Sequence, residues 1–137
     1  MKNIKFRQWT GSEWHYWGFY NNLFTNPVMD TSFGDGSYPD SLMFSGSTDS
    51  NKVEIFEGDI LHVQYSDQYN ADDYDAYVKV YSENGCVMVD YSGFGEDYKL
   101  SVGDFIEQIE DHSLDDDWSV VVFGNRVENS KLWDKLK

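Results

Sequence analysis

Apolar and polar residues alternate most clearly between residues 76 and 91, where two runs rich in Val and Tyr flank Asn84 and Gly85. A period of two is typical of a strand that buries one face. Asn-Gly is the preferred loop of a two-residue type I′ hairpin, because both residues tolerate positive φ. With these two residues as the loop, Val80 faces Val89, so the pattern predicts a β-hairpin of defined register.

Aromatic residues dominate residues 4–20, and a break at residues 10–12 divides them into two predicted strands joined by a turn. Residues 21–41 are expected to form a long loop, because Pro and Gly residues break regular structure there. Further strands are predicted in three segments, residues 42–45, 54–65 and 118–124.

One segment, residues 101–111, has the apolar spacing of a helix instead. Ser101 is a suitable N-cap for this helix. The run Asp115–Asp117 is expected to be a solvated loop, and Asn129 or Ser130 to cap a short final helix. The apolar positions at i, i+3, i+4 and i+7 are Val102, Phe105, Ile106 and Ile109.

Together these elements predict a mainly β protein with one or two short helices. A chain of 137 residues is long enough for one core, and its aromatic content of 18% favours strands and large buried contacts. We therefore expect a single domain over residues 1–137, built as a small curved sheet or a partly open SH3-like barrel.

The balance of charge is strongly acidic, with ten basic and twenty-five acidic residues and a net charge of −15 at pH 7. Binding to nucleic-acid phosphates depends on Lys and Arg displacing counterions, so direct nucleic-acid binding is not expected, and anionic membranes are disfavoured for the same reason. No run approaches the roughly 18 apolar residues of a membrane span, and the first residues lack the apolar core of a signal peptide. We expect a cytoplasmic protein without membrane contact.

One tract is more specific than any periodicity. Residues 54–61 read Glu-Ile-Phe-Glu-Gly-Asp-Ile-Leu, and all eight fit the string E-I-[YF]-E-G-D-I-[VL] that is central to the YopX family of phage and prophage proteins. Residues 4–9 and 122–129 lie where that family has its other tracts. The chain therefore resembles the YopX family, whose function is unknown. The resemblance implies a single YopX-like domain acting in the cytoplasm of a bacterial host.

Within these tracts, six positions are expected to serve the backbone path. A glycine inside a strand pattern suggests a bulge or bend, and the family carries no established catalytic residue that could be transferred. We therefore expect structural roles for Phe56, Glu57, Gly58, Asp59, Gly124 and Asn125.

The sequence shows no recognisable pattern of catalytic or metal-binding residues. His15, His62 and His112 share no ligand spacing, and the single Cys86 rules out an intrachain disulfide and a cysteine-based zinc site. Glycine-rich phosphate loops are also missing from the sequence. The sequence thus predicts no catalytic residue, no metal site and no cofactor, and a protein that is not an enzyme.

Two groups of residues are candidates for an interaction surface. An acidic face can dock onto a basic partner, and Tyr is enriched at interfaces. The alternative is a solvated surface that keeps the protein dispersed. The candidates are Glu107, Glu110, Asp111, Asp115, Asp116 and Asp117 among the acids and Tyr65, Tyr69, Tyr74 and Tyr77 among the tyrosines.

The favoured function is that of a non-enzymatic phage or prophage accessory protein that binds another protein. A basic host protein is one expected partner, and a second copy of the chain is another, because exposed strand edges promote self-association. Three alternatives stay open. They are an acidic nucleic-acid mimic that inhibits a host DNA- or RNA-binding protein, a small-molecule-binding protein or hydrolase, and a structural component of the virion.

Overall fold

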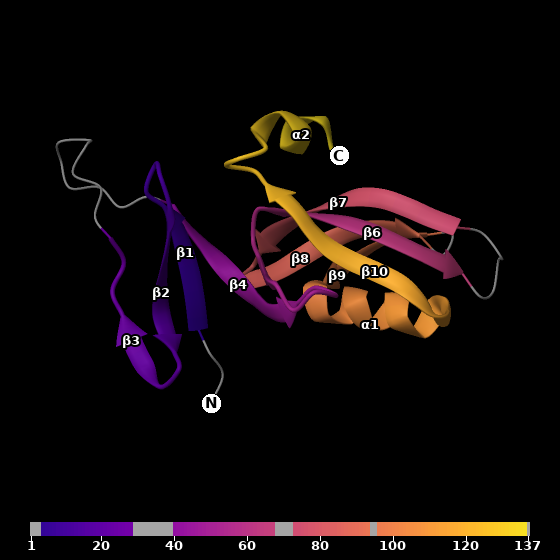
Figure 1. Ribbon diagram of the computed structural model, residues 1–137, viewed down its shortest axis with the longest axis horizontal. Helices are drawn as coiled ribbons and strands as arrows, with labels where there is room; N and C mark the ends of the chain where they lie inside the picture. The colour runs from indigo at the N-terminus through magenta and orange to yellow at the C-terminus, as the bar shows by residue number, and fades with distance from the viewer. Residues whose placement is uncertain (1–3, 29–39, 68–72, 94–95, 137) are drawn as a thin grey trace. The chain divides into compact units, whose positions relative to one another are not determined.

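The computed structural model describes residues 4–28, 40–67, 73–93 and 96–136. Within these ranges the protein is mainly β, with two antiparallel sheets and two short helices (Figure 1). The mainly β prediction is therefore confirmed. The sheets do not close into a barrel.

The chain divides into two compact units, Met1–Phe44 and Ser45–Lys137. The strand β4 (Ser41–Thr48) begins in the first unit and ends in the second. The single domain expected over residues 1–137 stays a prediction.

The first unit is an antiparallel sheet in the order β3-β2-β1-β4. The polar break predicted at residues 10–12 does form a turn, which a hydrogen bond from Thr10 N to Glu13 O closes at 3.0 Å. On one face, the rings of Phe6 and Trp17 stack with their centroids 4.5 Å apart. The strands that precede β4 are β1 (Ile4–Trp9), β2 (Trp14–Tyr20) and β3 (Leu23–Thr25).

The strand β3 lies inside the segment that the sequence predicted as a long loop. Asn21 and Asn22 take positive φ values of 54° and 62°, and Tyr20 pairs with Leu23 directly across them. Two consecutive residues with positive φ are the signature of a type I′ turn, so Asn-Asn serves here as Asn-Gly serves elsewhere. Residues 29–39 of the predicted loop lie outside the described residues.

The second unit contains a five-stranded antiparallel sheet in the order β10-β6-β7-β8-β9. The short strand β5 follows β4 and is its neighbour in the sheet order. The elements of this unit after β4 are β5 (Glu54–Phe56), β6 (Asp59–Asp67), β7 (Asp73–Glu83), β8 (Cys86–Gly93), β9 (Glu96–Ser101), α1 (Val102–His112), β10 (Ser113–Asn125) and α2 (Ser130–Lys135).

The helix α1 covers one face of this sheet and contacts β8, β9 and β10 (Figure 1). Its residues Phe105 and Ile109 are fully buried, as are Val63 and Val120 on the sheet. Ser101 is the N-cap, and its hydroxyl accepts a hydrogen bond from Asp104 N at 3.2 Å. The predicted helix and its cap are therefore confirmed. The apolar side of the helix covers the core of the unit.

The hairpin between β7 and β8 has the predicted loop and register. Asn84 and Gly85 have φ values of 53° and 80°, and Val80 pairs with Val89. Both valines are fully buried. The alternation of residues 76–91 thus specified which face of the hairpin enters the core.

The strand predicted over residues 54–65 is divided by a turn. Gly58 has a φ of 88°, its N–H donates to Val80 O at 2.7 Å, and its carbonyl accepts from Arg126 N at 2.8 Å. Asp59 is fully buried, and its Oδ2 accepts from Phe56 N at 2.8 Å. These bonds stabilise a turn that ends β5 and starts β6 in a new direction. A single continuous strand would not change direction here.

The tract at residues 122–129 meets this turn, because Asp59 pairs with Asn125. The Oδ1 atom of Asn125 accepts from Val127 N at 3.0 Å and from Glu128 N at 2.8 Å. A Cβ atom on Gly124 would lie 2.2 Å from the Asn129 side chain. Two of the three tracts on which the resemblance to the YopX family rests therefore form one junction, at the start of β6 and the end of β10.

A buried aspartate joins the turn after β4 to β10. Asp49 is 6% exposed. Its Oδ1 accepts from Asn51 N at 2.8 Å and from Val53 N at 2.9 Å, and its Oδ2 accepts from Val122 N at 2.8 Å. One carboxylate thus shapes the turn and binds the strand.

Ser50 continues this contact. Its N–H donates to Val120 O at 2.8 Å, and its hydroxyl accepts from Val120 N at 2.9 Å. Since β6 pairs with the other side of β10, the loop takes the place of a further strand along this edge.

Replacing Gly58 by Val should destabilise the protein by about 1–2 kcal/mol, because a residue with a Cβ is strained at this positive φ. Chemical denaturation would measure the loss. The matched control is Glu57→Gln, which keeps an oxygen for the Ser82 hydroxyl that lies 2.8 Å from Glu57 Oε2 and should change stability by less than about 0.5 kcal/mol. Equal stability of the Gly58→Val protein and the wild type would contradict this account of the turn.

Replacing Asp49 by Ala should cost about 2–3 kcal/mol, because backbone N–H groups lose a charged acceptor in a buried place. Asp49→Asn should cost less, since the amide oxygen can still accept from Asn51 and Val53 while the amide nitrogen cannot accept from Val122. Urea midpoints at constant m-value would measure both changes. An Asn variant as unstable as the Ala variant would show that the bond to Val122 dominates.

Candidate functional site

The sheet face that points away from α1 is polar near one end of β6. Alternation along β6 places Gln64 and Ser66 opposite to the buried Val63, and their partners across β7 are Asp75 and Asp73. We call this surface the outer face. It comprises His62, Gln64 and Ser66 of β6, Asp73, Asp75 and Tyr77 of β7, and Asp117, Ser119 and Phe123 of β10.

A hollow of about 380 Å³ lies at this end of the sheet. It is lined by three consecutive residues from each of three neighbouring strands, namely residues 64–66, 73–75 and 117–119. Three of the nine are aspartates, and none of the nine is basic. The hollow therefore gathers carboxylates that are far apart in sequence.

A serine links two of these carboxylates across the sheet. The Ser66 hydroxyl oxygen lies 2.9 Å from Asp73 Oδ1 and 3.3 Å from Asp117 Oδ2. A hydroxyl has a single hydrogen to donate, so it donates to one carboxylate at a time. Ser66, on the middle strand β6, thereby links a carboxylate of β7 to a carboxylate of β10.

The third carboxylate, Asp75, accepts two hydrogen bonds from β6. The Nε2 atom of His62 lies 2.7 Å from Asp75 Oδ1, and the Gln64 amide donates to Oδ2 at 3.0 Å. An ionised carboxylate only accepts, so Nε2 carries the hydrogen. The bond from His62, followed by that from Gln64, lowers the pKa of Asp75 from its ordinary 3.8.

A row of rings begins beside Asp75, at His62. His62 stacks on Tyr77 with ring centroids 4.6 Å apart, and Tyr77 meets Phe123 edge to face at 5.0 Å. Tyr77 is 38% exposed and Phe123 52% exposed. The outer face thus presents accessible aromatic surface beside negative charge.

The four candidate tyrosines have different positions. Tyr65 is buried and stacks on Tyr74 at 5.2 Å. Burial, followed by the neighbouring Tyr65, raises the pKa of Tyr74 above its ordinary 10.0. Tyr77 is exposed on the outer face, and Tyr69 lies outside the described residues. Of the three candidate tyrosines that the structure describes, Tyr77 is therefore the most accessible.

The candidate acids fall on two different surfaces. Glu107, Glu110 and Asp111 are exposed on α1, which packs its apolar side against the sheet. Asp117 is exposed on the opposite face, beside Ser66. The candidate acids, which are close together in sequence, are thus divided between a helix and the far side of the sheet.

The loop predicted for the aspartate run is wrong. Asp115, Asp116 and Asp117 belong to the strand β10, which starts at Ser113. Ser113 pairs with Asp67 and Trp118 with Tyr65, with an irregularity between them. The pairs with β6 on either side of the run keep it within the strand, although Asp has a local preference for loops.

Sequence reasoning missed most of the outer face. Its candidate list included Tyr77 and Asp117 but not the other residues of the face, which are His62, Gln64, Ser66, Asp73, Asp75, Ser119 and Phe123. One signal was available, because Asp73, Asp75 and Tyr77 are spaced two residues apart. Such spacing places three side chains on one face of a strand.

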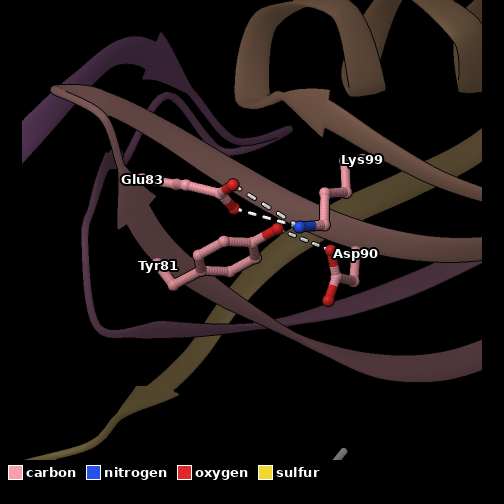
Figure 2. Close-up of polar contacts among 4 residues, drawn as sticks. All are labelled: Tyr81, Glu83, Asp90 and Lys99. Carbon is pink, nitrogen blue, oxygen red and sulfur yellow. Dashed lines mark hydrogen bonds and ion pairs between the residues drawn. The ribbon is translucent and has the colours of Figure 1, made fainter.

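A second polar cluster lies at the other end of β7 (Figure 2). The Tyr81 hydroxyl donates to Asp90 Oδ1 at 2.5 Å, and Lys99 Nζ lies 3.2 Å from Glu83 Oε2. Burial, followed by the bond to Asp90, raises the pKa of Tyr81 well above its ordinary 10.0. Each carboxylate drawn in Figure 2 has a donor from within the cluster, so the cluster reads as a cross-strand contact.

The described residues hold neither a metal-binding cluster nor a membrane-spanning helix. No group of three or more His, Cys, Asp or Glu side chains there is placed to hold a metal ion. Neither helix in the described part of the chain has the length and apolar character needed to cross a membrane.

Comparisons of the chain with protein-family models, with curated proteins and with solved structures found no match. The resemblance to the YopX family therefore rests on three sequence tracts and stays a prediction. What the protein does has to be inferred from the geometry of its surfaces.

Replacing His62 by Phe should raise the pKa of Asp75 toward its ordinary 3.8, because Phe keeps a ring for Tyr77 and removes the N–H donor. An NMR titration of the Asp75 carboxyl carbon would measure it. Since the fold lowers this pKa, the ionised carboxylate stabilises the protein above the ordinary pKa, and the contribution is lost as the pH falls below it. An unchanged pKa in the variant would rule out His62 as the main cause.

Proposed function

We propose that this protein is a non-enzymatic accessory protein of a phage or prophage that binds a basic partner protein through its outer face. One observation carries the proposal, namely that Asp73, Asp75 and Asp117 converge on a hollow whose nine lining residues include no basic side chain. Exposed aromatic residues are enriched at protein interfaces, and a patch of one sign of charge complements a partner of the opposite sign. We place the protein in the cytoplasm of the bacterial host, as its resemblance to the YopX family implies.

The distribution of charge supports a basic partner. Residues 45–137 carry seven basic and twenty-one acidic residues, a net charge of −14, whereas residues 1–44 carry three and four, a net charge of −1. The negative field therefore originates in the unit that holds the outer face. Such a field raises the rate at which a positively charged protein is captured.

The lining of the hollow favours a protein over a small molecule. Small-molecule pockets are mostly apolar, with a few polar groups that fix orientation. Six of the nine residues around this hollow are polar. A partner that brings its own charge satisfies such a surface better than an apolar ligand does.

The spacing along β6 supports a non-enzymatic role. Ser66 and His62 share the outer face but are four residues apart, a distance of about 13 Å in a strand. A nucleophilic serine needs its base within hydrogen-bond reach. In addition, Gly58, Asp59 and Asn125 of the family tracts are engaged in backbone contacts, which supports a structural role for those tracts.

Neutralising the hollow should abolish binding of the partner while the protein stays folded. The hollow variant carries Asp73→Asn, Asp75→Asn and Asp117→Asn. Immobilised wild-type and variant proteins would be exposed to a bacterial lysate, and the retained proteins quantified by mass spectrometry. We expect basic proteins on the wild type that are lost from the hollow variant and released by salt, since charges are screened over about 8 Å at physiological ionic strength.

The matched control is a helix variant with Glu107→Gln, Glu110→Gln and Asp111→Asn, which removes the same charge from α1. It should retain the partner, and circular dichroism should show that both variants fold. Equal loss from both variants would mean that net charge alone attracts the retained proteins, and the proposal would fail. Loss from the helix variant alone would move the interface to α1.

A further inference from the structure

We infer that the partner anchors itself to the outer face with the guanidinium group of an arginine side chain. The inference rests on the proposed function, because it specifies the chemistry of the partner at the same surface. Charge complementarity requires a cation, and three features of the face select arginine over lysine.

The first feature is the excess of acceptors. Asp73, Asp75 and Asp117 present carboxylate oxygens, which only accept hydrogen bonds. Guanidinium carries five N–H donors in a planar fork and no acceptor, whereas ammonium carries three donors on a single point charge. A donor-only planar group therefore matches the hollow best.

The second feature is the separation of the acceptors. Asp73 and Asp75 are two residues apart on β7, a spacing of about 6.5 Å. Asp117 lies on β10, two strands away from β7. Its Oδ2 is nevertheless 3.3 Å from the Ser66 hydroxyl oxygen, which is 2.9 Å from Asp73 Oδ1, so these two carboxylate oxygens are at most about 6 Å apart. A fork that spreads its donors can reach two such carboxylates at once, which strengthens the contact beyond a single ion pair.

The third feature is the row of rings. Guanidinium is weakly hydrated and stacks on aromatic faces while its edge pairs with a carboxylate. His62 already combines these contacts within the chain, since its planar ring stacks on Tyr77 at 4.6 Å and its Nε2 lies 2.7 Å from Asp75. Tyr77 and Phe123 retain exposed surface for a second planar group.

Two peptides of equal charge test this inference, hexa-arginine and hexalysine. General attraction to an acidic protein is similar for both, so the ratio of their dissociation constants, measured by calorimetry at fixed ionic strength, reports on the guanidinium group. We expect hexa-arginine to bind the wild type about tenfold more tightly than hexalysine. The helix variant should show the same ratio.

Two variants locate the preference. In a ring variant with Tyr77→Leu and Phe123→Leu every charge is kept, so binding of hexalysine should be unchanged while the preference for hexa-arginine falls toward one. In the hollow variant both peptides should bind weakly and with no preference. Melting curves would show that each variant is folded.

A ratio near one with the wild type would overturn the arginine assignment. A preference that survives in both the ring and hollow variants would overturn it as well, because the guanidinium would then bind elsewhere. Neither result decides the proposed function, which fails separately if the hollow variant retains its partners from the lysate.

Discussion

The strand β10 has polar backbone groups along both edges, and the second unit depends on how they are satisfied. Along one edge, β10 forms backbone hydrogen bonds with β6. Along the other edge, Asp49 accepts a hydrogen bond from the strand, and Ser50 both accepts one and donates one. A buried N–H group without an acceptor is costly, so these contacts hold β10 in one register. A slip of one residue would turn Val120 outward and Asp117 inward, which would destroy both the core and the hollow.

Local chemistry was enough to predict some elements and not others. The loop at Asn84 and Gly85 and the cap at Ser101 were predicted correctly, because neighbouring residues determine both. A bulge or bend was predicted at Gly58, but the division into two strands was not, because the turn depends on Val80 and Arg126, which are distant in sequence. The strand β3 was missed because its turn of two asparagines was read as part of a loop.

The candidate site was harder to predict than the fold, because the register of the strand pairs determines which side chains lie next to one another. The sequence grouped acids that are close together along the chain, whereas the structure groups Asp117 with Ser66, which lies 51 residues earlier. Which strands pair, and in which register, cannot be read from periodicity alone. The acids of α1 are followed closely by Asp117 along the chain. In the fold they lie on the helix side of the sheet, whereas Asp117 lies on the opposite face.

The shared hydrogen of Ser66 has a consequence for the unbound protein. Two carboxylates compete for one donor, so the hydroxyl has two arrangements of similar geometry, and each leaves one neighbour without that hydrogen bond. Such a site is locally frustrated, in contrast to the mutually supportive contacts of the core. A ligand rich in donors would end the competition by supplying the hydrogen that the fold lacks, and the frustration of the free protein would then become part of the free energy of binding.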